Sequence, residues 1–356
     1  MCRRLILAVL LVPIFAISLP LGTIGGPQAG SDTADQAAIQ EAASWIGHED
    51  KVETEYHYVM TCKLRLLLFW AGSDDVGGGY VRIGKASGDE QQQMIQVLFG
   101  SDPAKAPLAI NRWGAGTEVL RGADSGQPVA SAFFGFMKSS KGQSVLAMKS
   151  ELSKEKTNGN HLFEGIISRV DDGRALSTTV PYSSNRDFDV HQYAEAEKAT
   201  LQQLESNPSR HIRSLDGAAR KACPRAGEFL STTFQLIDDA VAGHTTPDSL
   251  CYIYNAHHYK ATLLSVHPVE EKKVHVTLRG KGKAFDQTYR HLREAHFEVA
   301  NDDTGTKSSF DILLGTEGNL RGTPVQILYT PNWWFEIILN LAPASPQPLN
   351  PGTSLR

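Results

Sequence analysis

EYHYVMTCKLRLLLFWAGSDDVGGGYVRIGK, residues 55–85, carries the strongest strand signal in the chain. Its β-branched, aromatic and continuous apolar residues predict one strand over 55–71 and a second over 79–85. The glycine-rich stretch between them predicts a hairpin loop. Consecutive glycines let a ligand approach the backbone, and Asp74 and Asp75 carry the oxygen ligands that a hard cation such as calcium prefers. This loop is therefore either a binding site or a plain connection between two strands.

Strand-like runs separated by glycine-rich turns continue from this stretch as far as residue 181. They include 93–99, 130–137, 144–155 and 161–170. The pair Asn158–Gly159 suits a type I′ turn, because both residues tolerate positive φ, and it predicts a hairpin between the last two runs. Residues 55–181 are therefore predicted to form an N-terminal β domain.

Helical periodicity occurs in two places. Small and apolar residues recur at helical spacing from Ala34 to Ile46, which predicts a short helix within 31–47. Residues 190–243 show helical composition, with a second helical stretch over 210–222 and Gly243 as a stop signal. We therefore expect a helical connector over 190–243.

Alternating patterns return over 249–341 and predict six strands joined by turn-like segments, the simplest arrangement being a meander. The first of these strands is expected over 251–266. Val274 and Val276 alternate with hydrophilic neighbours, so one face of the sheet is expected to be wet. A sheet of this kind commonly curls into a half-open barrel around an apolar concavity. The proline-rich tail, 342–356, is predicted to be disordered.

The predicted fold class is mainly β with a helical connector, α+β overall. Antiparallel meanders are expected to form two sandwich-like or half-barrel-like domains, one over 55–181 and one over 249–341. The chain has 356 residues, of which 41% are hydrophobic. That length and composition suffice for two domains with their own cores.

The N-terminus predicts export. Two arginines, Arg3 and Arg4, precede an apolar run over 5–15, and a small-x-small triplet follows at 16–18. These are the three parts of a secretory signal peptide, which we expect over 1–22 with cleavage between 18 and 29.

An uncleaved membrane anchor is the alternative interpretation of this segment. The apolar run is shorter than the ~20 residues that a membrane-spanning helix needs, and Pro13 and Pro20 interrupt it. The mature protein is therefore predicted to be periplasmic or extracellular, without a stable transmembrane anchor after processing.

Three cysteines remain after the leader, with Cys2, is removed: Cys62, Cys223 and Cys251. In an oxidising compartment the pair closest in sequence, Cys223 with Cys251, is the expected disulfide, and the alternative is three inert thiols. Cys62 lies in an apolar run and is expected to be buried as a small hydrophobic residue.

The formal net charge is −4, and it becomes −6 when Arg3 and Arg4 are removed with the leader. Binding to phosphate groups requires a basic surface. Nucleic acid is therefore not expected as a partner.

Seven of the twelve histidines lie between His244 and His296. His257 and His258 are adjacent, so on a strand they point to opposite faces and cannot share an ion. His291 and His296 are five residues apart instead of the four of a zinc-protease helix. No nucleophile elbow occurs either. No metal, cofactor or catalytic residue is therefore predicted.

Aromatic residues gather late in the second β region, at Tyr329, Trp333 and Trp334. Such side chains at a sheet rim can stack on sugar rings or acyl chains, and the alternative is that they fill the core. They are the candidate ligand-binding residues, together with Asp74 and Asp75.

These patterns favour an exported, non-catalytic protein that binds an apolar or carbohydrate ligand, or serves as a scaffold for an envelope protein. The alternative is an extracytoplasmic hydrolase or metal-dependent enzyme that uses histidines and aspartates of the C-terminal region. An enzyme requires at least three polar groups converging in one pocket, whereas a binding protein requires an apolar cavity.

Overall fold

The structure is a computed structural model that describes most of the chain from Thr33 onward. The described residues are 33–46, 50–66, 69–86, 92–121, 129–138, 161–171, 174–184, 188–206, 211–215, 223, 228–244, 248–278, 283–332 and 335–343. The predicted leader, the strand at 144–155, the turn at Asn158–Gly159 and the tail beyond residue 343 lie outside them.

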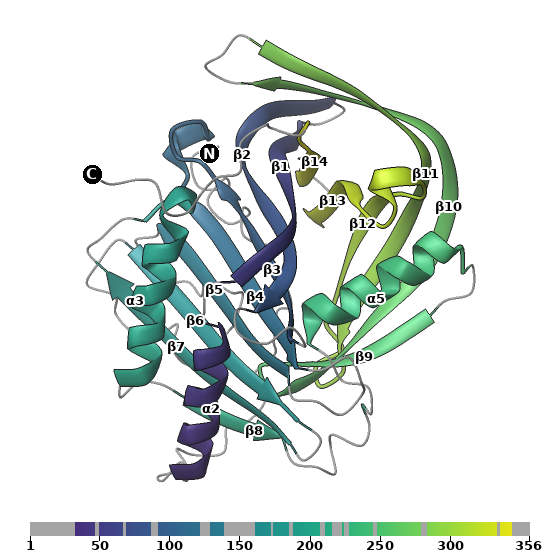
Figure 1. Ribbon diagram of the computed structural model, residues 1–356. Coiled ribbons are helices and arrows are strands. Elements are labelled where there is room, and N and C mark those ends of the chain that lie inside the picture. Colours follow the sequence, from purple (N-terminus) through teal and green to yellow (C-terminus); the bar gives the residue numbers. More distant parts are fainter. Residues whose placement is uncertain are drawn as a thin grey trace.

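In the described part of the chain, fourteen antiparallel strands form one continuous sheet (Figure 1). Their order across the sheet is β8-β7-β6-β5-β4-β3-β2-β1-β14-β13-β12-β11-β10-β9. The N-terminal strands are β1 (Asp50–Leu66), β2 (Phe69–Ala86), β3 (Gln92–Ser101), β4 (Arg112–Arg121), β5 (Val129–Lys138), β6 (His161–Val170), β7 (Ala175–Ser184) and β8 (His211–Leu215). The C-terminal strands are β9 (Asp248–Tyr254), β10 (His257–Leu278), β11 (Lys283–Asn301), β12 (Lys307–Gly315), β13 (Pro324–Asn332) and β14 (Phe335–Leu341).

Three α-helices accompany the sheet in the described part of the chain: α2 (Thr33–Ile46), α3 (Tyr193–Ser206) and α5 (Phe229–Ala242). Short 3-10 helices are η3 (Pro107–Ala109), η5 (Val190–Gln192) and η6 (Gly318–Leu320). Among the described helices, none has the length and apolar character needed to cross a membrane. The predicted helix over 31–47 and the stop at Gly243, whose φ is 84°, are confirmed.

The predicted fold class, mainly antiparallel β with few helices, is confirmed. Both expected meanders are present, and the pairing of β1 with β14, from Tyr58 opposite Leu341 to Leu64 opposite Phe335, joins them edge to edge. The chain therefore builds one sheet that runs through both halves. Its division into separate domains stays a prediction.

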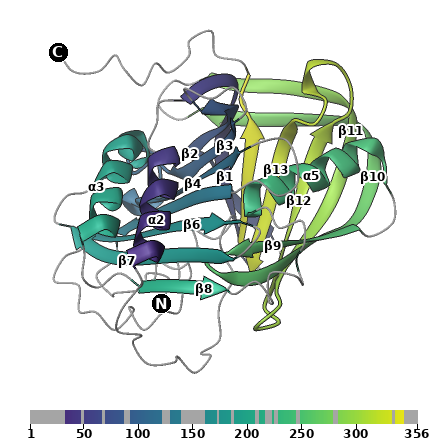
Figure 2. The same ribbon diagram turned by 60° about the horizontal axis from the view of Figure 1, so that its bottom comes forward.

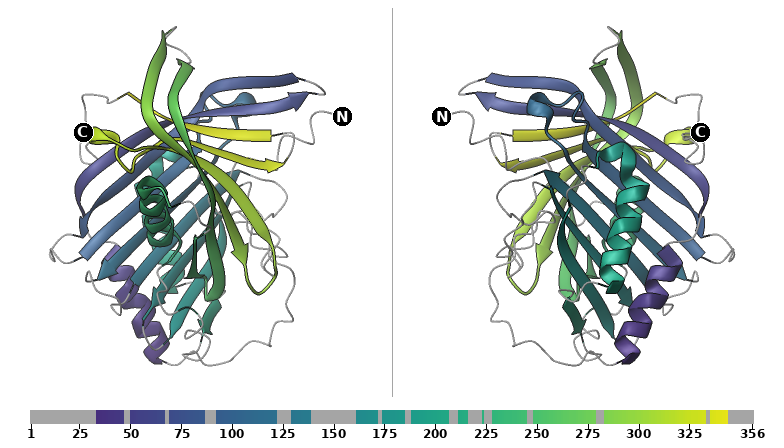
Figure 3. Two further views of the ribbon diagram at one scale, coloured as in Figure 1. Left: turned by 90° about the vertical axis from the view of Figure 1, so that its right-hand side faces the viewer. Right: turned by 90° about the vertical axis from the view of Figure 1, so that its left-hand side faces the viewer.

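The N-terminal half of the sheet is covered on both faces. On the outer face, α2 packs across β4–β7 and α3 across β6 and β7 (Figures 2 and 3). Trp113, Phe134 and Phe163 are fully buried there. Because both faces are covered, β3 is buried along almost its whole length and its pattern of burial does not alternate.

The inner face of the sheet holds α5. This helix contacts β9, β10, β11 and β12 in the C-terminal half and β4 in the N-terminal half, and the curved C-terminal strands surround it (Figure 1). Leu236, Ile237 and Ala240 of α5 join the large core shared by both halves. The concavity expected from the sequence is therefore present as a curve of the sheet, and α5 occupies it.

The glycine-rich stretch at 72–78 is not a loop, which corrects the sequence prediction. It lies inside β2, where Asp74, Asp75 and Val76 form a bulge opposite Thr61 alone. Asp75 has a φ of 50°. The bulge bends the strand pair, as bulges do in antiparallel sheets.

Two further predictions are wrong. Residues 211–215 form β8, the edge strand beside β7, instead of helix. The expected strand over 251–266 is broken by a two-residue turn, Asn255–Ala256, which joins β9 to β10. Both turn residues have positive φ, 49° and 54°, as a type I′ turn requires.

The Asn255–Ala256 turn lies on the inner face of the N-terminal half, so the sheet overlaps itself. Asn255 Oδ1 accepts hydrogen bonds from Ser177 Oγ at 2.8 Å and Thr179 Oγ1 at 3.2 Å, both on β7. Tyr254 packs edge-on against Phe133 of β5, with ring centroids 5.0 Å apart. We call this contact between the β9–β10 turn and β5–β7 the overlap.

A disulfide beside the overlap links β9 to the segment that follows β8. Cys223, which follows β8, is bonded to Cys251 of β9 with their Cα atoms 5.4 Å apart, and this is the pair that the sequence favoured. Cys62 is free and half-buried, and burial raises its pKa to about 12. The thiol of Cys62 is therefore a poor nucleophile at neutral pH.

The overlap predicts a large cost for changes at Asn255, whose side chain is 1% exposed. Asn255→Gly keeps the positive φ but removes the acceptor of two buried hydroxyls, so it is expected to lower the free energy of unfolding by about 1–3 kcal/mol. Asn255→Ala adds a left-handed backbone penalty of roughly 1–2 kcal/mol. Urea unfolding of both variants measures the two effects separately. Wild-type stability in Asn255→Gly contradicts the overlap as a stabilising contact.

Candidate functional site

Most of the candidate residues from the sequence serve contacts within the fold. Asp74 Oδ1 accepts from Thr61 Oγ1 and Oδ2 accepts from the backbone N–H of Thr277 on β10, each at 3.0 Å. Asp75 is buried and pairs with Lys105 Nζ at 3.0 Å. The bulge in β2 therefore ties the long β10–β11 hairpin and the segment after β3 to the sheet.

The aromatic candidates are only partly described. Tyr329 of β13 is 3% exposed, and burial raises its pKa to about 12. Its hydroxyl oxygen accepts from Ser308 Oγ of β12 at 3.4 Å. Tyr329 fills the core, while Trp333 and Trp334 lie outside the described residues.

Two buried glutamates meet at the N-terminus of α5. Glu118, in the middle of β4, accepts hydrogen bonds from the backbone N–H groups of Leu230 and Ser231, the latter at 2.8 Å. It therefore caps the helix from a distant strand, since a helix begins with unpaired N–H donors that favour negative charge. Burial nevertheless raises the pKa of Glu118 to about 7.

Glu228, the N-cap residue of α5, lies beside Glu118 and is also fully buried. Burial, and next the charge of Glu118, raise the pKa of Glu228 well above its ordinary value. Ser131 Oγ lies near this carboxyl and favours its ionised form, although without the geometry of a hydrogen bond. Two acids so close together cannot both ionise easily, so at least one carries a proton at neutral pH.

A second cluster bridges the two ends of the sheet. His257 of β10 lies between Arg213 of β8, whose Nη1 is 2.8 Å from His257 Nε2, and Asp303, whose Oδ2 is 2.7 Å from His257 Nδ1. A histidine–carboxylate pair is an arrangement that enzymes use for proton transfer. Here, however, the free nitrogen faces a guanidinium, which has no proton to give up at neutral pH.

A third polar cluster lies on the outer face, around Gln96 of β3. Gln96 Oε1 accepts from Tyr80 and Arg82, and its Nε2 donates to Thr117 and to Tyr193 of α3. The network continues beyond these residues, from Tyr193 Oη to Glu197 at 2.7 Å and from Arg82 Nε to Glu55 at 2.6 Å. It attaches the start of α3 to β2–β4.

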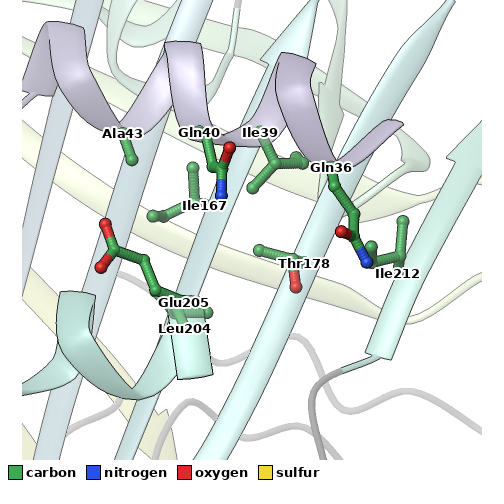
Figure 4. Close-up of a pocket in the computed structure, with 9 residues that line it drawn as sticks. All are labelled: Gln36, Ile39, Gln40, Ala43, Ile167, Thr178, Leu204, Glu205 and Ile212. Atoms are coloured by element: carbon green, nitrogen blue, oxygen red, sulfur yellow. The ribbon is translucent and has the colours of Figure 1, made fainter. Parts of the chain in front are cut away.

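A shallow groove opens between α2 and α3 on the outer face (Figure 4). Its enclosed volume is about 20 Å³, room for roughly one water molecule. Figure 4 shows Gln36 and Gln40 reaching from α2 and Glu205 from α3 toward a floor of aliphatic side chains. Its lining residues are Gln36, Ile39, Gln40, Ala43, Ile167, Thr178, Leu204, Glu205 and Ile212.

Thr178, on β7, gives this groove an unusual polar group. Its side chain is 1% exposed, and Oγ1 has no hydrogen-bond partner among the described residues. A buried hydroxyl without a partner costs stability, and an incoming donor or acceptor can recover it. The groove therefore combines apolar contact area with one unused polar group.

No set of three histidine, cysteine, aspartate or glutamate side chains able to hold a metal ion occurs in the described part of the chain. His257 is engaged as above, and His296 Nδ1 pairs with Asp311 of β12 at 2.5 Å. Sequence reasoning missed Glu118, Gln96 and Thr178. Their strands gave no clear signal, because Gln96 lies near two other glutamines, Glu118 follows a threonine, and Thr178 lies in a run of serine and threonine.

The Glu118 cap predicts a specific pH dependence of stability. Its folded pKa of about 7 lies above the unfolded value, so its contribution to stability is present at low pH and is lost as pH rises from about 4.5 to 7. Glu118→Gln removes this titration and can satisfy only one of the two N–H donors. Between pH 5 and 8 we expect the variant to lose less stability than wild type, by about 1–3 kcal/mol. Urea unfolding at both pH values measures this.

Glu298→Gln, on the surface of β11 beside Lys307, is the control and should keep the wild-type pH dependence. Identical pH profiles for Glu118→Gln and wild type contradict the proposed titration of Glu118.

Comparison with known proteins gives no functional identity. No protein-family model matches the chain, and no curated protein matches it. Among solved structures, one similar chain is the crystal structure of a beta-barrel-like protein of a domain of unknown function, DUF1849, from Brucella abortus. It is 11% identical, with a TM-score of 0.35, and the match covers 82% of this chain and 98% of that one. No family is therefore assigned.

Proposed function

We propose that this chain is an exported, non-catalytic protein of the periplasm or extracellular space. In this proposal it binds an apolar or sugar-like ligand in the groove between α2 and α3, or presents that groove to an envelope protein. The observation that carries the proposal is that the polar clusters of the described chain link elements of the fold, while the groove retains an unused polar group.

Two features support export. The N-terminal segment has the charge, apolar run and small residues of a signal peptide. The Cys223–Cys251 disulfide is of the kind that persists in oxidising compartments and is rare in the cytosol.

The buried or paired polar groups bind other parts of the fold, which supports a non-catalytic role. Glu118 and Glu228 are both fully buried, and Glu118 caps α5. The nitrogen of His257 that would act as a base instead accepts from Arg213. These groups favour a role in holding the fold over the hydrolase alternative, because a catalytic group must reach its substrate.

The groove supports the choice of ligand. Ile39, Ile167 and Leu204 provide an aliphatic floor, and Gln40 and Glu205 lie at its rim. Amide, carboxylate and hydroxyl groups around apolar area bind ligands that have both an apolar body and hydroxyls. In the enclosed volume of about 20 Å³, binding requires outward movement of the rim side chains.

Export is tested with the full-length chain expressed behind its own N-terminus. The protein recovered from the exported fraction should begin between residues 19 and 30 by intact mass. After denaturation without reductant, one cysteine of the mature chain, Cys62, should react with a thiol reagent, and all three should react after reduction. A cytoplasmic product with its leader intact contradicts the proposal.

Ligand binding is tested by titrating the mature protein with monomeric octyl glucoside, which has an apolar chain and a sugar head. Amide NMR shifts should change along α2, α3 and β7. Ala43→Trp fills the groove and should weaken binding by at least about tenfold, which corresponds to roughly 1.4 kcal/mol. Ala37→Trp, at an exposed position of the same helix, is the matched control and should bind as wild type does.

Thr178→Val tests whether the ligand forms a hydrogen bond with the Thr178 hydroxyl, apart from its apolar contacts with the groove. Because Oγ1 has no partner among the described residues, this near-isosteric change should leave stability unchanged or raise it, while binding weakens severalfold. Shifts that are absent, or that persist in both Ala43→Trp and Thr178→Val, contradict binding in the groove.

A further inference from the structure

Besides apolar packing such as that of Tyr254 on Phe133, the overlap and its surroundings are held by the disulfide, the Asn255 hydrogen bonds and the Arg213–His257–Asp303 bridge. Of these, the bridge is the one whose charge can change near neutral pH, because histidine titrates in that range. It also joins the two ends of the sheet, since Arg213 lies on the edge strand β8 and His257 lies on β10, next to the opposite edge strand β9.

The hydrogen bonds of the bridge specify one form of His257. Arg213 Nη1 can only donate, so Nε2 of His257 must accept. The ring proton therefore resides on Nδ1 and is donated to Asp303 Oδ2. The bridge accommodates neutral imidazole in this single tautomer. A second proton on Nε2 removes the acceptor for Arg213 and places two cations in contact.

The groups that face His257 come from several elements. They are Arg213 on β8, Asp303 in the turn after β11, and Tyr254 of β9, the cross-strand partner of His257; the adjacent His258 points to the other face of β10 but is close enough for its charge to act. Asp303 favours the protonated ring, but its side chain is 47% exposed, so solvent weakens this effect. Burial, Arg213 and His258 all favour the neutral ring, and the net result is a lowered pKa of His257.

We propose that the Arg213–His257–Asp303 bridge is a pH-sensitive latch that releases the β9–β10 turn from the inner face of β5–β7 on acidification. The disulfide keeps the released segment tethered, because Cys251 lies four residues before Asn255. Opening uncovers apolar inner-face residues such as Phe133 and Ile253. This property is independent of the groove, which lies on the outer face.

The sign of the pH dependence follows from the direction of the pKa shift. A histidine with a lowered folded pKa binds its proton more readily in the open state. The latch is therefore stable above the ordinary pKa of about 6.5 and weakens as pH falls below it. An exported protein meets the pH of its surroundings, so the change is one that the molecule can experience.

Hydrogen exchange of the mature, oxidised protein at pH 7.5 and pH 5.0, corrected for the intrinsic exchange rate, tests the latch. Protection of peptides over 248–263 should fall severalfold at pH 5.0, whereas peptides over α2 (33–46) should keep their protection. A wild-type protein without local loss at pH 5.0 overturns the proposal. Loss over α2 and 248–263 together also overturns it, because the opening is then global.

Two variants assign the effect to His257. Glutamine can present an acceptor near the position of Nε2 but does not titrate, so His257→Gln should keep protection at both pH values. His275→Gln is the matched control: His275 lies on the same strand and pairs with Asp286 at 2.6 Å, but both are exposed. It should respond to pH as wild type does. An undiminished acid response in His257→Gln overturns the latch.

Arg213→Met tests the other half of the bridge if His257→Gln does not fold. Without the guanidinium, the protonated ring meets no cation from β8. The NMR-measured pKa of His257 should therefore rise. Peptides over 248–263 should be less protected than in wild type at pH 7.5, and their protection should change less between pH 7.5 and pH 5.0. A His257 pKa that does not move in Arg213→Met also overturns the proposal.

Discussion

The overlap between the β9–β10 turn and the inner face of β5–β7 determines the rest of the structure. An open sheet of fourteen strands has two edges with unpaired N–H and C=O groups, which invite association with other chains. Here one end of the sheet folds inside the other. The disulfide across this contact closes a chain segment of 28 residues, for which loop entropy suggests about 3–4 kcal/mol.

Because the sheet folds onto itself, its two halves face different environments, and their sequences reflect this. The N-terminal half is covered by α2 and α3 outside and by α5 and the overlap inside, so β3 is buried on both faces. The C-terminal part of β10 is covered on one face, and its buried Val274 and Val276 alternate with exposed residues. These two patterns, continuous and alternating, made both meanders predictable from local sequence.

The parts that sequence did not predict depend on contacts between distant segments. The stretch around Asp74 and Asp75 has the composition of a loop, but it pairs with β1 and β3, and its aspartates bind Lys105 and the backbone of Thr277. The turn at Asn255 interrupts a run of aromatic and β-branched residues, and the hydroxyl groups that donate to the Asn255 side chain come from β7. Glu118 has no local signal for helix capping, because the helix that it caps begins more than a hundred residues later.

The buried acids and the half-buried His257 respond to pH in opposite directions, so the stability of the overlap and that of the α5 N-terminus change in opposite senses. As pH falls, the raised pKa values of Glu118 and Glu228 mean that the N-terminus of α5 becomes more stable. Over the same range the lowered pKa of His257 means that the overlap becomes less stable. Acid therefore weakens the contact between the two sheet ends while it stabilises the buried glutamates at the N-terminus of α5. A fold with this distribution of buried charge opens locally at the overlap, with α5 still in place between the two halves.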